Sequence, residues 1–123
     1  MDNKLLIDNF RIPNINNKNL IKFIVNKLDG NPKLLSKIPI IKKPNCFELK
    51  CHANVEKYQL LYGGHRIIGY YFIEDIQTSK IYGIKHSIWL NTFNELIDIT
   101  PFSDSRTYNI FYPYQFAIDK IIL

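Results

Sequence analysis

Cys51, His86 and Asp98 are the residues whose types and order in this chain are best suited to chemistry. A cysteine attacks a carbonyl as the thiolate, and a helix N-terminus or a nearby imidazolium favours that charged form. Cys51 opens the stretch CHANV, where a helix is predicted to begin. If the fold brings the three side chains together, they form a thiol–imidazole–carboxylate triad.

Of the three histidines, His86 is the best candidate for the base. His52 follows Cys51 directly and, on a helix, points about 100° away from it. His65 lies in the loop GGHR, where an exposed histidine needs no special role. His86 lies in the middle of a predicted strand, YGIKHSIWL, where a histidine is either a satisfied core residue or a base held by a partner.

Asp98 supplies that partner from the next predicted strand, where it stands between two isoleucines. Burying a carboxylate there without a partner would cost several kcal/mol. A hairpin with its loop near residues 91–94 places His86 and Asp98 within about one residue of direct opposition. The pair requires a loop of odd length or a bulge, because direct pairing of residues 90 and 95 would turn Asp98 away from His86.

The nucleophile would lie on a helix predicted over residues 52–62, which carries an apolar stripe and ends at Gly63 and Gly64. The start of this helix has two readings. Asn45 with Glu48 resembles a capping box, which would begin the helix at Cys46 and favour that thiol. Alternatively residues 45–50 are extended and Cys51 lies in the first turn, which is the reading we prefer.

The rest of the pattern predicts a single α+β domain over residues 1–123, with an antiparallel sheet following the helices. Residues 1–44 form a helical and extended N-terminal segment, with a helix inside 16–32 that Asn17 or Asn19 caps and an extended connection over 33–45. Residues 45–123 hold the catalytic-type helix and the sheet. Strands are expected at 65–75, 80–90, 94–100 and 115–123, with irregular chain and one short strand over 101–114.

These motifs together resemble the transglutaminase-like branch of the papain-like thiol enzymes, over residues 51–101. The matching residues are Cys51, Asn54, Val55, Gly69, Tyr70, His86, Trp89, Asp98 and Thr100. The resemblance implies a helix carrying the nucleophile packed on an antiparallel sheet. It also implies amide chemistry: hydrolysis of a peptide, deamidation of a glutamine, or acyl transfer to an amine.

Four further residues are candidates for supporting roles. By its place before the cysteine, Asn45 resembles the amide that helps papain-like enzymes to hold the oxyanion, and the Cys51 backbone N–H is another donor. Asn54 lies one helical turn after Cys51 and would orient the site or close a helix–sheet contact. Tyr70 and Trp89 would line a substrate groove, although strand aromatics are more often core.

Composition limits the other classes of function. Two cysteines are too few for a disulfide scaffold, C-x4-C-H is not a zinc spacing, and no metal or organic cofactor is expected. Eleven of the sixteen basic residues lie in residues 1–62, but their lysines are spaced as on a solvated surface. The aromatic-rich residues 63–123 carry a small excess of acidic residues. We therefore do not expect nucleic acid as a partner. The abundance of Ile, Asn and Lys is typical of AT-rich genomes.

We expect a cytoplasmic protein, since no signal peptide or transmembrane segment is recognisable. The expected partner is a peptide or protein substrate with an amide group, with room for an additional protein partner because the chain is short. The alternative to an enzyme is an inactive member of the same fold that binds protein or nucleic acid.

Overall fold

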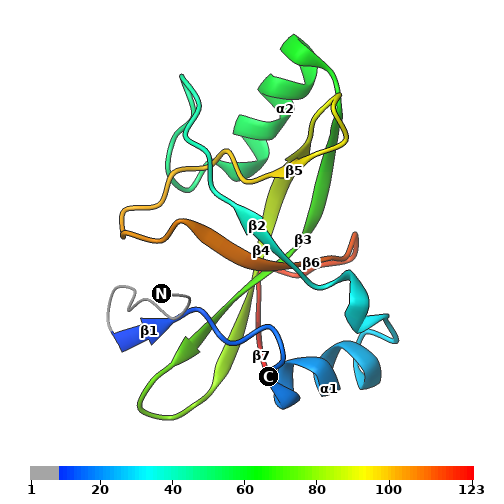
Figure 1. The fold of residues 1–123 in the computed structure, drawn as a ribbon, viewed down its shortest axis with the longest axis vertical. Helices are drawn as coiled ribbons and strands as arrows, with labels where there is room; N and C mark the ends of the chain where they lie inside the picture. The colour runs from blue at the N-terminus through cyan, green and yellow to red at the C-terminus, as the bar shows by residue number, and fades with distance from the viewer. Residues whose placement is uncertain (1–8) are drawn as a thin grey trace.

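The computed structural model describes residues 9–123, which fold into two α-helices and a seven-stranded sheet (Figure 1). The elements, in chain order, are β1 (Phe10–Arg11), α1 (Lys18–Asn26), a 3-10 turn η2 (Pro32–Leu34), β2 (Ser36–Pro39), α2 (Cys51–Tyr62), β3 (His65–Asp75), β4 (Ile81–Leu90), β5 (Leu96–Ile97), β6 (Tyr108–Pro113) and β7 (Lys120–Ile122). The α+β class with an antiparallel sheet is therefore confirmed.

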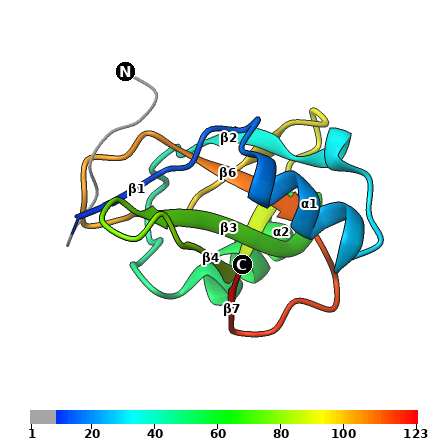
Figure 2. The same ribbon diagram turned by 90° about the horizontal axis from the view of Figure 1, so that it is seen from below.

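The long hairpin β3–β4 forms the centre of the sheet, with the strand order β2-β6-β3-β4-β5. β1 pairs with β3 and β7 pairs with β4, each at the end of the hairpin away from α2. All strand pairs among residues 9–123 are antiparallel. The twisted sheet separates the two helices, with α2 at the top of Figure 1 and α1 at the bottom, and Figure 2 shows the same hairpin from below.

The helix α1 covers the lower part of the sheet through one apolar face. Leu20 and Ile24 are buried in a cluster that includes Phe72 of β3. Asn17 caps the helix, because its side-chain oxygen accepts hydrogen bonds from the N–H groups of Asn19 and Leu20. Of the two predicted caps, Asn17 is the one used.

The helix α2 begins at Cys51, so the alternative start at Cys46 is wrong. Val55 and Tyr58 pack on Trp89 and Ile97 of the sheet, which fixes the helix against β4 and β5. Among the residues that the structure describes, no side chain caps its first turn. The N–H groups of this turn therefore lack the side-chain acceptor that a capped helix would provide.

Three segments differ from the sequence expectation. The connection predicted over 33–45 contains a strand, β2. The predicted strand 94–100 pairs with β4 only at Leu96 and Ile97. The predicted strand 115–123 is limited to β7. The reason for the short β5 is that the chain leaves β4 at Asp98. Its N–H donates to the Pro39 carbonyl, and its carbonyl accepts from the Ile41 N–H, in a parallel bridge to the end of β2.

Candidate functional site

The Cys51 side chain lies against an open stretch of the edge of β4. On this edge β4 pairs with β7 over residues 82–84 and with β5 over residues 89–90. Residues 85–88 between them have no strand partner within residues 9–123. The Lys85 N–H in this gap donates to the Asp119 carbonyl. The next N–H on the same edge, that of Ser87, lowers the pKa of the Cys51 thiol. The gap thus provides the place where the first turn of α2 meets the sheet.

The Cys51 thiol has a pKa below its ordinary value. Burial by itself raises the pKa of this half-buried thiol, but the hydrogen bond and positive charge of His86 outweigh that effect. The backbone N–H groups of Ser87 and His52 add to the lowering. This is the direction of shift that a reactive thiol requires.

His86 is 3% exposed and stands between the thiol and the carboxylate. Its Nε2 lies 2.7 Å from Oδ2 of Asp98, and the ring is close enough to Cys51 for the two groups to shift each other's pKa. Since Nε2 faces the carboxylate, Nδ1 is the ring nitrogen left for the sulfur. Burial lowers the pKa of His86, but the charge and hydrogen bond of Asp98 outweigh it, followed by those of Cys51, and raise the pKa to about 9.

The hairpin register explains how His86 and Asp98 meet. Leu90 pairs with Leu96 and Trp89 with Ile97, so the loop covers residues 91–95 and has the odd length that the pair requires. Continued by one step, this register puts Asp98 across from Ile88, two residues away from the position opposite His86. The expectation of an offset of about one residue was therefore wrong by one step, but the two side chains share a face and lie within diagonal reach.

Asp98 is fully buried and accepts three hydrogen bonds, which compensate for its removal from water. Oδ2 accepts from His86 and from the side-chain amide of Asn109 at 3.0 Å, and Oδ1 accepts from the Thr100 N–H at 3.1 Å. With both oxygens engaged, the carboxylate is held in one orientation toward the imidazole.

Arg106 and Asn109 are residues of this site that the sequence reasoning missed. Asn109, 1% exposed on β6, accepts a hydrogen bond from Nη1 of Arg106 while it donates to Asp98. The guanidinium of Arg106 is also ion-paired with Asp104 at 2.7 Å and lies 4.1 Å above the ring of Phe102. A signal for Asn109 did exist, because it is a polar residue inside the apolar sequence YNIFYP. Like Asp98, it would need a hydrogen-bond partner if it were buried there.

A cleft of about 350 Å³ opens beside the thiol and the imidazole. Its lining includes Cys51, His86, Tyr71, Ile84, Phe102 and Arg106. Tyr71 and Phe102 contact His86 with ring centroids 5.0 and 5.7 Å away, and Tyr71 contacts Phe102 edge-on at 5.5 Å. An aromatic wall of this kind limits water around the reacting groups and strengthens charge interactions there.

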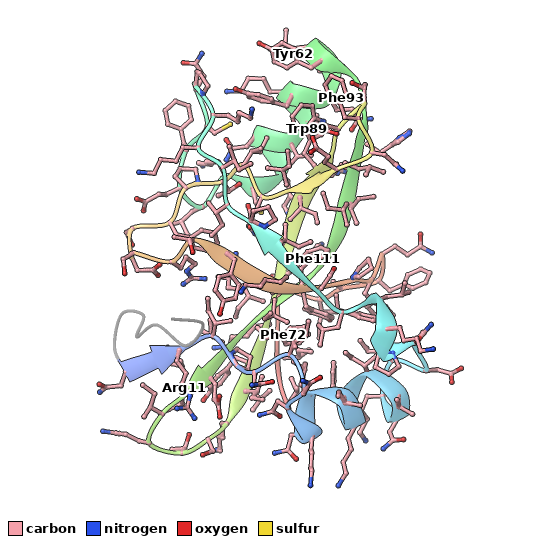
Figure 3. All side chains as sticks on the ribbon, in the orientation of Figure 1. Arg11, Tyr62, Phe72, Trp89, Phe93 and Phe111 are labelled. Atoms are coloured by element: carbon pink, nitrogen blue, oxygen red, sulfur yellow. The ribbon has the colours of Figure 1, made fainter. Side chains whose placement is uncertain are left out.

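The two predicted groove residues lie elsewhere. Tyr70, 2% exposed, points to the opposite face of β3, where its hydroxyl accepts from the Ile118 N–H in the core. Trp89 packs under α2, donates to the Gly63 carbonyl, and contacts Tyr62 near the tip of the helix (Figure 3). Tyr70 misses the cleft because successive side chains of a strand point to opposite faces, so the neighbouring Tyr71 faces the cleft instead.

The two candidate asparagines have hydrogen-bond partners other than the thiol. Asn45 has an exposed side chain outside the cleft, and its carbonyl accepts from Lys57, so a role for Asn45 in holding an oxyanion is not supported. Asn54 is buried and bonds to the backbone N–H and carbonyl of Phe47 and to Oγ1 of Thr100. It therefore orients the loop before Cys51 against the segment that follows Asp98.

The other thiol and histidines have different surroundings. Burial raises the pKa of Cys46, whose partners are Lys57, Tyr58 and Lys43. His52 is hydrogen-bonded through Nδ1 to the Ser87 hydroxyl, and its pKa is lowered, by burial first and then by nearby positive charges. Of the cysteines and histidines, which all lie within residues 9–123, only Cys51 and His86 line the cleft.

In residues 9–123 no group of three or more His, Cys, Asp or Glu side chains is arranged to hold a metal ion. Within the same residues, no helix has the length and apolar character needed to cross a membrane. Comparison with known proteins adds no assignment, because no family model, curated protein or solved structure matches the chain.

Proposed function

We propose that this protein is a thiol-dependent amide hydrolase or acyl transferase, with Cys51 as nucleophile, His86 as acid and base, and Asp98 as the group that orients His86. The observation that carries the proposal is the 2.7 Å hydrogen bond from His86 to the buried carboxylate of Asp98, on an imidazole that lines one cleft together with Cys51 and lowers the pKa of that thiol. A papain-like core is part of the proposal, since α2 presents the cysteine to the strands that carry the histidine and the aspartate.

The electrostatics favour a thiolate–imidazolium pair as the resting state. A lowered pKa of Cys51 and a raised pKa of His86 both stabilise the transfer of the thiol proton to the ring. The same proton is then available for the leaving group. Asp98 keeps the ring in place and stabilises its positive charge, as a triad carboxylate does.

The reaction has two halves. The thiolate attacks the carbonyl carbon, an S–C bond forms, and the carbonyl electron pair moves to oxygen. The oxyanion then returns its electrons, the C–N bond breaks, and the amine leaves with the proton of His86, giving a thioester on Cys51. Water or a second amine, deprotonated by His86, resolves the thioester. The uncapped N–H of Cys51 at the start of α2 is suited to bind the oxyanion.

An acylation experiment tests the proposal. With p-nitrophenyl acetate, the protein should release p-nitrophenolate and carry an acetyl group on the Cys51 peptide in mass spectrometry. Cys46→Ala should be acylated like the parent, and Cys51→Ala should not be acylated on Cys46. Equal acylation of both single variants, or none of the parent, would reject the enzyme and leave the inactive binding module as the better reading.

A further inference from the structure

Tyr71 is the hydroxyl-bearing residue of the cleft with no task in the folded chain. Three such residues line the cleft: Tyr71, Thr100 and Ser103. Thr100 is buried and accepts from Asn54, and Ser103 is exposed on the loop. For Tyr71, by contrast, no hydrogen-bond partner exists among residues 9–123, although its ring is packed on three sides by His86, Phe102 and Arg106.

The placement of Tyr71 is rigid and close to the reacting groups. It lies in the middle of β3, paired on one side with Ile84 of β4 and on the other with Phe111 of β6. A central strand holds a side chain more firmly than a loop does, which a stabilising donor requires. Its ring meets the imidazole of His86 edge-on, at 5.0 Å and 82°.

The charges around Tyr71 suit a hydrogen-bond donor. Burial raises the pKa of its hydroxyl, so the group keeps its proton at neutral pH. The negative charges of Asp98 and Cys51 raise the pKa further. The guanidinium of Arg106, 5.5 Å from the ring centroid, acts in the opposite direction and favours negative charge near the hydroxyl.

We infer that Tyr71 is a further catalytic residue, whose hydroxyl donates a hydrogen bond to the oxyanion formed when Cys51 attacks an acyl carbonyl. It fills the role that the sequence assigned to Asn45, together with the Cys51 N–H. The inference rests on the proposed function. In the step concerned, the S–C bond forms and the carbonyl π electrons move to oxygen, where the hydroxyl stabilises the charge without losing its proton.

The test compares two reactions of the same thiol in the Tyr71→Phe variant. Acylation by p-nitrophenyl acetate passes through an oxyanion, whereas alkylation by iodoacetamide displaces iodide and does not. Tyr71→Phe keeps the ring packing, so it should slow acylation at least about 10-fold and leave alkylation within about twofold of the parent.

Tyr70→Phe is the matched control, since it removes the neighbouring hydroxyl from the core face of β3. Both rates should stay within about twofold of the parent, even where stability falls. Unchanged acylation in Tyr71→Phe, or equal slowing of both reactions, would overturn the role of Tyr71. Failure of the proposed function looks different: Cys51 of the parent protein would not be acylated at all.

Discussion

His86 and Asp98 meet on one face of the sheet although the hairpin does not pair them directly. Nε2 and Oδ2 lie 2.7 Å apart, while the register offsets Asp98 by two residues from the position opposite His86. The offset coincides with the point where Asp98 leaves β4 for the end of β2. The Asp98 backbone is held at the end of β2, and its carboxylate is held by the amide of Asn109. Asp98 is thereby fixed where its charge acts on the imidazole.

Asp98→Asn should remove the charge that stabilises imidazolium while keeping the size of the side chain. Without that charge, burial dominates and the pKa of His86 falls from about 9 to its ordinary value of about 6.5 or lower. The thiolate of Cys51 then loses its partner, and alkylation by iodoacetamide at pH 7 should slow about 10-fold or more. Asp119→Asn, an exposed carboxylate, is the control and should alkylate like the parent. An unchanged rate in Asp98→Asn would show that the carboxylate does not act on His86.

Cys51→Ala should make the stability of the protein depend on pH in a new way. The folded pKa of His86 is raised, so its contribution to stability is complete below about 6.5, the unfolded value, and is lost as the pH rises through about 9. In the proposed thiolate–imidazolium pair, folded and unfolded states of the parent each hold one proton between the unfolded pKa values of the two groups, about 6.5 and 8.5: on His86 when folded, and on the thiol when unfolded.

The free energy of unfolding of the parent should therefore depend little on pH through this pair between about pH 6.5 and 8.5. In Cys51→Ala the unfolded state holds no proton there, so the free energy of unfolding should fall with pH, by at most about 1.4 kcal/mol per pH unit. Urea unfolding at several pH values measures the slope, and adding His86→Gln should abolish it. A parent and a Cys51→Ala variant with the same slope would argue against an ion pair between the thiol and the imidazole.

Asn109→Leu should destabilise the fold through Asp98. The change removes one of three donors to a fully buried carboxylate and one acceptor of Arg106, whose partner Asp104 remains. Loss of such a partner costs about 1–3 kcal/mol of the free energy of unfolding. The midpoint of urea unfolding measures this cost, and Asn19→Leu on the exposed side of α1 should change it little. Equal midpoints for Asn109→Leu and the parent would contradict the role of Asn109.

Local signals in the sequence were enough to place the nucleophile helix and the central hairpin. Gly63 and Gly64, both with positive φ, end α2 as expected, and β3 spans the predicted residues 65–75. The predicted hairpin and the carboxylate between two isoleucines indicated the contact of His86 with Asp98, on the condition of an odd loop or a bulge, and the structure has the odd loop.

The contacts that the sequence did not reveal are between segments distant along the chain. β2 reads as a proline-broken connection because its strand character comes from pairing with β6, some seventy residues later. Likewise Asn109 reaches Asp98, and Arg106 reaches Asn109, only because β6 lies between β2 and β3. Residue patterns encode periodicity along the chain, but they do not state which distant strand becomes the neighbour.

The most direct test of the account is the rate of iodoacetamide alkylation of Cys51 and Cys46 against pH, followed separately by peptide mass spectrometry in one sample. Cys46, whose pKa is raised by burial, serves as the internal control. The expected result is a midpoint for Cys51 below the ordinary value of about 8.5, a midpoint for Cys46 above it, and loss of the low Cys51 midpoint in His86→Gln. Midpoints of Cys51 and Cys46 that coincide at or above the ordinary value would contradict it.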